Sequence, residues 1–347
     1  MPELPEVEVV RAGLAPAVTG ALVVGVEVLD ARSLKRHNAA SGAFESLVTG
    51  ARIEAAVRRG KFLWLPFRPA SLVAVAGVSG ADASGSAGGA DAAPGGADAA
   101  PGGADADAAP LALVGHLGMS GQMLLRTPDH PGDDRHARIR LHLEHAGHGE
   151  LRVDFVDQRI FGSLAVDRLV PTADGAVAGF SGDVTGAWAR SIPTQVAHIA
   201  RDPLDPAFDE RAFFAALARR ATGIKRVLLD QGVVSGIGNI YADEALWAAK
   251  LHPEQPAASI SRRRTRELLD AVRDVLLKAL AEGGTSFDAQ YVNVNGASGY
   301  FAHSLNAYGQ MGRPCPRCGT PIVREPFMNR SSHRCPRCQR VRVSRGG

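Results

Sequence analysis

Residues 1–10 read MPELPEVEVV, with two prolines and two glutamates ahead of a run rich in valine. Proline suits the first turn of a helix, where its missing N–H leaves no intrahelical bond unmade, so we expect a helix to begin at Pro5. Proline at position 2 is small enough for the initiator methionine to be removed, which would leave Pro2 with a free secondary amine. The stretch therefore predicts a helix that carries a reactive chain terminus.

The amine of Pro2 is a candidate nucleophile. The reference pKa of an α-amino group is about 7.7 to 8.0, against about 10.4 for lysine, so far more of this amine is neutral at pH 7. A secondary amine condenses with an aldehyde-level sugar carbon to give an iminium ion. Glu3 beside it is placed to deliver a proton, and Pro5 would direct its carboxyl group. For Glu6 and Glu8 we favour a simpler interpretation, in which they balance the positive end of the helix dipole.

The length and composition limit the class of protein. A chain of 347 residues is long for one hydrophobic core, so we expect two domains. An apolar content of 45% is ordinary for a folded protein. No run of about 18 apolar residues occurs, and the first residues are acidic where a signal peptide would be basic. We therefore expect a cytoplasmic protein without a membrane partner.

The net charge of +3 conceals an uneven distribution. Residues 77–110 hold five aspartates and no Lys or Arg, so the rest of the chain carries +8. Residues 313–345 hold nine arginines and one acid, Glu325. Clustered arginine suits phosphate contacts, although a solvated basic tail would have the same composition.

The four cysteines form two CPRC motifs, at residues 315–318 and 335–338. The spacing C-x2-C-x16-C-x2-C is typical of a four-thiolate zinc site, because each C-x2-C turn presents two sulfurs to one tetrahedral ion. Two disulfides are the alternative, and a cytoplasmic location disfavours them. We expect one structural Zn²⁺, held by Cys315, Cys318, Cys335 and Cys338.

Residues 77–110 repeat the unit APGGADA with a period of seven. Gly, Ala, Pro and Asp in this mixture cannot bury enough apolar surface to offset the entropy of ordering, so we expect a disordered insertion. Strand-like segments lie on both sides, which predicts an excursion between two strands rather than a domain boundary.

The remainder divides into a strand-rich part and a helix-rich part. Apolar residues alternate in ALVVGVEVLD, KFLWLPF, SLVAVAG and LALVGHL, and the pair ARIRLHLEH and ELRVDFV predicts a hairpin. Beyond residue 205 the spacing becomes helical. We expect an α+β protein with an N-terminal β-sandwich that includes one helix (1–170), a linker (171–204), a helical domain (205–305) and a zinc ribbon (306–347).

The stretch GVVSGIGN, residues 232–239, separates two of the predicted helices. Gly236 and Gly238 allow a close approach of backbone to a ligand, and Asn239 is well placed to cap the next helix. The free N–H groups of a helix N-terminus bind anions, although a plain turn between helices would explain the glycines equally well.

These motifs, in this order, resemble the bacterial formamidopyrimidine-DNA glycosylases, which remove oxidised purines such as 8-oxoguanine. The resemblance rests on the opening stretch and on RRGKFLW, GHLGMSGQM, DQRIFG, GIGNIYADEALW, YVNVNGASGYF and the zinc ribbon. It spans nearly the whole chain except residues 77–110. It implies a helix–two-turn–helix domain, double-stranded DNA with oxidised bases as the partner, nucleoid association and a monomer.

The resemblance also implies roles for single residues. Pro2 matches the nucleophile that attacks the sugar C1′, and Glu3 matches the acid that protonates the sugar. Lys61 matches the proton donor in β-elimination, and Arg330 matches the arginine tied to δ-elimination and phosphate binding.

Six further residues match positions of the family that contact DNA. An enzyme that flips a base must fill the gap left in the duplex, and apolar wedges commonly do so. The gap-filling residues would be Met119, Arg159 and Phe161, with Arg159 facing the orphaned cytosine. Without the resemblance, Met119 and Phe161 would more often be core residues. The other DNA contacts would be His136, Arg220 and Asn239, and Ser286 to Tyr300 resembles the loop that closes over the base.

The chain departs from the common pattern of the family at Gln158 and Ile160 of DQRIFG, and Arg220 stands where lysine is frequent.

Two alternatives stay open. An endonuclease VIII type shares the fold, Pro2 and Glu3 but prefers oxidised pyrimidines. A noncatalytic DNA-binding paralogue could dispense with Pro2, Glu3 and Lys61, all of which this chain keeps.

Overall fold

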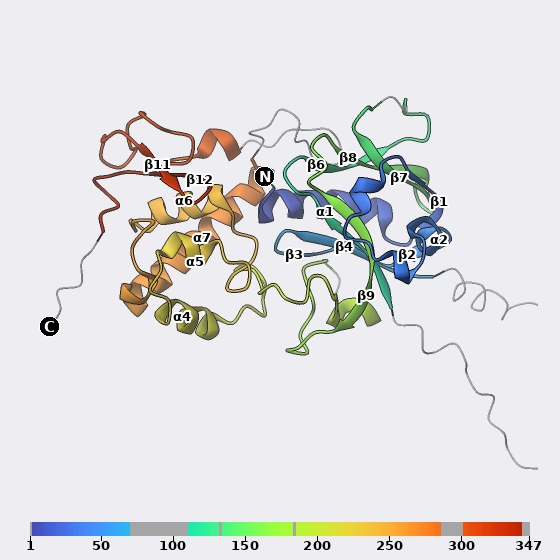
Figure 1. Cartoon of the computed structure of the whole chain (residues 1–347), viewed down its shortest axis with the longest axis horizontal. Coiled ribbons are helices and arrows are strands. Elements are labelled where there is room, and N and C mark those ends of the chain that lie inside the picture. Colours follow the sequence, from blue (N-terminus) through green and yellow to red (C-terminus); the bar gives the residue numbers. More distant parts are fainter. Residues whose placement is uncertain (1, 70–109, 132–133, 183–184, 286–300, 342–347) are drawn as a thin grey trace, which may run out of the picture.

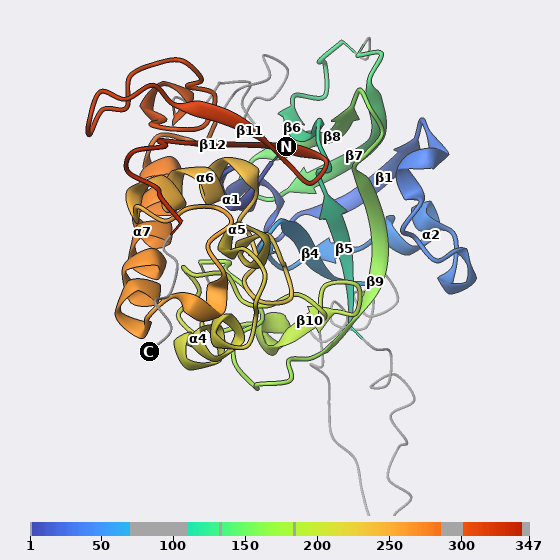
Figure 2. The same cartoon turned by 60° about the vertical axis from the view of Figure 1, so that its left-hand side comes forward.

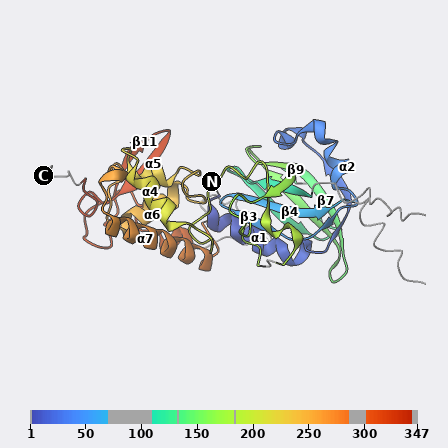
Figure 3. The ribbon, with the colours of Figure 1, turned by 90° about the horizontal axis from the view of Figure 1, so that it is seen from below.

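The computed structural model describes residues 2–69, 110–131, 134–182, 185–285 and 301–341. A sheet-rich half and a helical half lie side by side, and the N-terminus lies where the two halves meet (Figures 1 and 3). The protein is therefore α+β, as the sequence predicts. Among the described residues, no helix combines the length and the apolar character needed to cross a membrane.

Helix α1 (Leu4–Val18) connects the two halves. It begins directly after Glu3, with Pro5 in its first turn, which agrees with the position expected from the sequence. Leu4 is buried in the core of the helical half, whereas Val7, Val10 and Leu14 are buried in the core of the sheet. One rigid helix therefore orients the chain terminus relative to both cores.

Within the described residues, the sheet half contains ten strands, and every pair of neighbours is antiparallel. The order along the main path is β10-β9-β5-β4-β2-β1-β7-β8-β6, and β3 pairs with β4. The strands are β1 (Leu22–Val28), β2 (Arg52–Ile53), β3 (Val57–Arg59), β4 (Phe62–Arg68), β5 (Leu111–His116), β6 (Gly121–Arg126), β7 (Ala137–His145), β8 (Gly149–Asp157), β9 (Ser163–Pro171) and β10 (Ser191–Pro193). Helix α2 (Phe44–Val48) packs beside them.

The path folds over to form the expected sandwich. Leu63 of β4 and Phe155 of β8 share one buried core, although the two strands lie far apart in the strand order. Alternate residues of β4, such as Trp64, instead pack into a second cluster with Trp188 and Ile192. Residues 171–204, expected as a linker, thus supply strand β10 and part of that cluster, and the division into domains stays a prediction.

The predicted hairpin is confirmed in its register. Ile139 lies opposite Phe155, Leu141 opposite Val153 and Leu143 opposite Leu151. All six side chains belong to, or pack against, the same core. Period-2 alternation predicts this arrangement because successive side chains of a strand point to opposite faces.

The helical half contains α4 (Glu210–Ala218), α5 (Ile224–Leu228), α6 (Asn239–Ala248) and α7 (Arg262–Ala281) around one apolar core. The C-terminal hairpin β11 (Val323–Phe327) and β12 (Arg330–Arg334) lies over α6 (Figure 2). Short 3-10 turns complete the described chain at Ala31–Leu34, Ala39–Ser41, Ala187–Arg190, Ala257–Ser259 and Phe301–Ser304.

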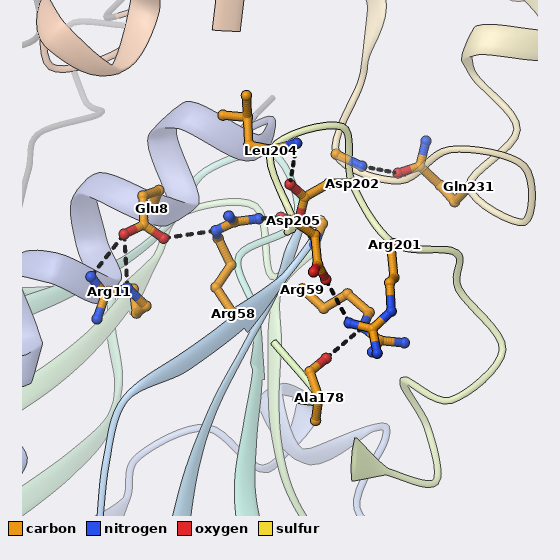
Figure 4. A network of polar contacts seen from close by, with 12 residues as sticks. Glu8, Arg11, Arg58, Arg59, Ala178, Arg201, Asp202, Leu204, Asp205 and Gln231 are labelled. Carbon is orange, nitrogen blue, oxygen red and sulfur yellow. Dashed lines mark hydrogen bonds and ion pairs between the residues drawn. The ribbon is translucent and has the colours of Figure 1, made fainter. Parts of the chain in front are cut away.

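A buried ionic network joins the two halves (Figure 4). The Arg58 guanidinium of β3 lies 2.8 Å from Glu8 of α1 and 2.9 Å from Asp202, which follows the sheet half in sequence. Only 3% of the Arg58 side chain is exposed, so its charge needs a buried partner. Glu8 also pairs with Arg11 at 2.8 Å, so two arginines are balanced by two carboxylates. The interpretation of Glu8 as an acid that balances the helix dipole stays a prediction, and the structure shows in addition that Glu8 is buried against arginine.

Strands β4 and β5 flank the insertion predicted from the sequence. They are adjacent and antiparallel, with Phe67 opposite Leu111. Most of residues 77–110, together with the strand expected in SLVAVAG (71–77), lies outside the described residues. The paired ends show that this segment joins two strands of one hairpin, as expected.

We predict that a turn of about five residues can replace residues 70–109 without loss of stability. Each halving of a flexible loop reduces the entropy cost of closure by about 0.6 kcal/mol, so the free energy of unfolding should rise by up to about 2 kcal/mol. Urea unfolding would measure the change. A Gly/Ser segment of the original length is the matched control, and a shortened variant less stable than that control would contradict the prediction.

Candidate active site

The carboxylate of Glu3 is held by the N-terminus of α6. It accepts hydrogen bonds from the backbone N–H groups of Gly238 at 2.6 Å, Ile240 at 2.9 Å and Tyr241 at 3.3 Å. The prediction that Asn239 caps this helix is wrong. Glu3, more than 230 residues away in sequence, supplies the anion, and Gly238 occupies the cap position because a Cβ there would lie 2.3 Å from the Glu3 carboxyl carbon.

Burial gives Glu3 the proton affinity of a general acid. Glu3 is 2% exposed, and its pKa is raised to about 7. Burial is the largest cause of the rise, Lys61 opposes it, and the nearby Glu6 adds to it. A carboxyl group with a pKa near the ambient pH can both hold a proton and release it to a substrate. Pro2 directly precedes Glu3 and is itself buried.

Glu6 serves as an acceptor in the same region. It accepts hydrogen bonds from the Glu3 N–H at 2.8 Å, the Tyr241 hydroxyl at 2.5 Å, and the N–H and hydroxyl of Thr285, both at 2.8 Å. Glu6 lies in the first turn of α1, where a dipole-balancing acid is expected, and the tertiary structure adds these buried contacts. Thr285 directly precedes residues 286–300, the expected base-covering loop, which lies outside the described residues.

Lys61 approaches Glu3 from the sheet half. It lies in the turn between β3 and β4, and its Nζ donates a 2.8 Å hydrogen bond to the Ile237 carbonyl. Burial lowers the pKa of this amine and nearby Arg330 lowers it further, while Glu3 opposes the fall. Gly60 lets the turn come close, since a Cβ there would lie 2.7 Å from the Ser235 hydroxyl.

A groove of about 560 Å³ opens beside these groups. Three of the predicted site residues line it: Lys61, Arg220 and Arg330. Arg220 is also paired with Asp230 at 2.7 Å. His116, which the sequence analysis did not single out, lines the groove as well, and burial lowers its pKa to about 4, so its ring is neutral at pH 7. The groove lining therefore holds four basic side chains, since Arg226 also belongs to it, against one acid, Asp230, and this net positive charge suits an anionic ligand.

Arg330 lines the groove as the first residue of β12, directly after the turn that joins β11 to β12. The exposed Met328 adopts a positive φ of 53° in this turn and lines the groove beside it. The hairpin is anchored on α6 by Asp243, which accepts hydrogen bonds from the Ser332 hydroxyl and the His333 N–H, both at 2.8 Å.

The fully buried Lys225 also binds Asp243, the residue that holds the hairpin on α6. Its Nζ lies 2.6 Å from Asp243 and 4.7 Å from the centre of the Phe327 ring. The sequence analysis missed this pair. Two charged residues on separate helices carry no local signal of their pairing.

The four cysteines fit the predicted zinc site. All four sulfurs lie within 4.8 Å of one another, and the Sγ of Cys318 is 3.5 Å from that of Cys335 and 3.4 Å from that of Cys338. Tetrahedral zinc with bonds of about 2.3 Å places its sulfurs about 3.8 Å apart. Trp247 of α6 donates from Nε1 to Cys315 at 3.4 Å, which connects the cluster to the helical half. One structural zinc ion is the cofactor of this protein.

Met119 and Phe161 project from two loops of the sheet half that touch each other. Their side chains are 41% and 53% exposed, unusual for large apolar residues that pack in a core. The loops meet at Gly118, whose φ is +64° and where a Cβ would lie 2.4 Å from the Gly162 nitrogen. Ile160 also adopts a positive φ, of 55°.

Asp157, fully buried at the end of β8, holds both loops. It accepts hydrogen bonds from the Ser120 hydroxyl at 2.6 Å, the Arg159 N–H at 3.1 Å and the Gly162 N–H at 2.7 Å. The sequence analysis did not predict this role, although an aspartate at the end of a strand and ahead of a turn was a usable signal.

The two remaining predicted contacts lie apart from the groove lining. The His136 carbonyl accepts from the Asp157 N–H at 2.9 Å, so His136 lies beside the residue that holds the two loops. Asn239, in the first turn of α6, donates from its side chain to the Ser331 carbonyl at 3.0 Å.

Comparison with known proteins agrees with this arrangement. The formamidopyrimidine-DNA glycosylase N-terminal domain matches residues 1–164, the H2TH domain of the same family matches residues 199–290, and a zinc finger found in FPG and IleRS matches residues 312–341. A formamidopyrimidine-DNA glycosylase of Leifsonia xyli subsp. xyli is 58% identical over 342 residues, which cover 98% of this chain and 100% of the relative.

Solved structures that contain DNA share the fold. Lactococcus lactis Fpg in complex with an abasic site containing DNA gives a TM-score of 0.68 at 26% identity and covers 97% of this chain and 99% of that one. MutM in complex with carbocyclic 8-oxo-G containing DNA gives a TM-score of 0.69 at 26% identity and covers 98% and 100%.

We predict that removal of zinc by a chelator will unfold the β11–β12 hairpin and leave the sheet half intact, because a structural zinc ion contributes folding energy directly. Amide exchange of residues 323–334 should then rise by orders of magnitude while that of β7 and β8 does not change. Cys318→Ser should behave in the same way without chelator. Unchanged protection of the hairpin after complete zinc loss would contradict the prediction.

Proposed function

This chain belongs to the formamidopyrimidine-DNA glycosylase family of DNA repair enzymes, which combine glycosylase and abasic-site lyase activity, and from that premise we propose that it excises oxidised purines from double-stranded DNA through a covalent intermediate on Pro2. The observation that carries the proposal is the buried Glu3 carboxyl group, with a pKa of about 7, directly after Pro2 and near Lys61.

In the first step the neutral amine of Pro2 attacks C1′ of the damaged nucleotide. The C1′–N bond to the base breaks as the new C–N bond forms, and the base leaves with the electron pair. The amine loses its proton on forming this bond, which balances the proton that the departing base takes up. Glu3 then protonates the sugar ring oxygen, so the C1′–O4′ bond breaks and the Schiff base forms. Holding acid and nucleophile on adjacent residues removes the entropy cost of bringing them together.

In the second step the Schiff base makes the C2′ proton acidic. Loss of that proton expels the 3′-phosphate by β-elimination, with Lys61 as the proton donor. Elimination of the 5′-phosphate follows, and Arg330 stabilises the phosphate charge. Hydrolysis of the remaining imine frees Pro2. The position of Lys61 and Arg330 on one groove supports this assignment.

The paired loops support a base-flipping enzyme. Extrusion of a base costs a few kcal/mol of stacking, and an apolar wedge offsets part of that cost. We assign this role to Met119 and Phe161, with Arg159 facing the unpaired cytosine. The relative that contains carbocyclic 8-oxo-G supports a purine lesion. We assign further DNA contacts to His136, Arg220 and Asn239.

The decisive test is borohydride trapping on a duplex that contains 8-oxoguanine opposite cytosine, followed by mass mapping of the crosslink. We expect one adduct, at Pro2. An adduct only at Lys61, or no adduct, would overturn the mechanism. Faster cleavage of a thymine glycol duplex than of the 8-oxoguanine duplex would favour the endonuclease VIII type. The monomeric state and the cytoplasmic, nucleoid-associated location stay predictions.

The pH dependence of base excision should be bell-shaped, with its maximum between about 7 and 8. Excision requires a protonated Glu3, whose pKa is about 7, and a neutral Pro2 amine, whose reference pKa is about 7.7 to 8.0. Glu3→Gln should lower the single-turnover rate by about 10² to 10⁴, the range typical of a lost general acid. Glu150→Gln, an exposed glutamate in β8, is the matched control. A Glu3→Gln rate within threefold of the wild type would rule out the assignment.

A further inference from the structure

The loop ahead of α6 holds both candidate catalytic side chains. Its N–H groups from Gly238 onward bind the Glu3 carboxylate, and its Ile237 carbonyl accepts the hydrogen bond from Lys61 Nζ. The orientation of a single carbonyl therefore decides where the Lys61 ammonium lies relative to Glu3. Whatever holds this carbonyl also controls the position of Lys61.

Gln231 holds that carbonyl. Its Nε2 donates to Ile237 O at 3.0 Å and to Leu229 O at 3.0 Å, and its Oε1 accepts from the Gly236 N–H at 3.0 Å. The amide group of Gln231 thus binds the N–H of Gly236 and the carbonyl of the next residue, Ile237. Gly236 has a φ of +87°, a conformation that glycine adopts without strain and that lets its N–H face Gln231.

The backbone of Gln231 is tied to the segment between the two halves. Its carbonyl accepts from the Ala200 N–H at 2.9 Å, and the Ser235 N–H donates to Arg201 O at 3.4 Å. Figure 4 shows the Gln231 amide oxygen accepting a hydrogen bond from a backbone nitrogen. Asp202 in turn pairs with Arg58, three residues before Lys61. The segment around Arg201 and Asp202 therefore contacts both the backbone of Gln231 and, through Arg58, the strand that leads into the Lys61 turn.

We infer that Gln231 is a positioning residue that orients Lys61 for the elimination step through the Ile237 carbonyl. The inference rests on the proposed role of Lys61. Gln231 lines the groove, but both of its amide protons are committed to backbone carbonyls, so it orients the site instead of donating to the substrate. Only a side chain that both donates and accepts at this reach can bridge Gly236 and Ile237.

The test uses duplex DNA with a preformed abasic site, so that base excision is bypassed. Gln231→Met keeps the length of the side chain and removes both hydrogen-bonding functions. We expect single-turnover strand cleavage to fall about 10- to 100-fold, the cost typical of a misplacement of about 1 Å. Borohydride trapping at Pro2 should stay within twofold of the wild type. Gln195→Met, at a half-buried glutamine after β10, is the matched control and should cleave at the wild-type rate.

Gln231→Glu adds a pH readout that a merely structural role would not produce. Its carboxylate can accept from Gly236 but cannot donate to Ile237, whereas its protonated form can do both. The cleavage deficit relative to the wild type should therefore shrink as the pH falls through the pKa of the new carboxyl group. A deficit independent of pH would overturn the inference.

The outcomes separate this inference from the proposed function. Cleavage by Gln231→Met within twofold of the wild type, or an equal loss of trapping and cleavage, would overturn the role of Gln231. An absence of the Pro2 adduct in the wild-type protein would instead overturn the proposed function.

Discussion

The carboxylate of Glu3 on the N-terminus of α6 is the contact on which the site depends. A buried carboxylate is costly unless it is hydrogen-bonded, and the N–H groups of Gly238, Ile240 and Tyr241 satisfy it. In a helix that begins without its own capping side chain, the same groups would lack partners. The carboxylate and the helix N–H groups therefore satisfy each other's hydrogen bonds. The same contact ties the N-terminal segment to the helical half.

Helix α6 also contacts, and so positions, the other parts of the site. Its middle carries Asp243, which pairs with Lys225 and anchors the zinc hairpin that bears Arg330. Its last turn carries Trp247, which donates to Cys315 and lies 4.0 Å below the Arg317 guanidinium. Glu3, Lys61 and Arg330, to which we assign the roles of acid, elimination lysine and phosphate-binding arginine, are thus positioned by α6 and the loop ahead of it, although they come from three distant segments.

The same burial links stability to chemistry. The folded-state pKa of Glu3 is raised above its ordinary value, so its contribution to stability is fully present below about pH 4.5 and is lost as the pH rises through about 7. The protein therefore holds a proton at the position where the proposed reaction consumes one.

The sequence by itself determined the features that depend on local geometry. The start of α1 follows from Pro5, the β7–β8 register from alternation, and the zinc cluster from cysteine spacing, because each is decided within a few residues or by one repeated motif. Only the tertiary structure decided that Glu3 caps α6 in place of Asn239, that Glu6 and Glu8 are buried, and that Gln231 supports Ile237. These contacts join segments that are far apart in the sequence and that meet because α1 packs between two cores. No residue spacing in the sequence indicates that packing.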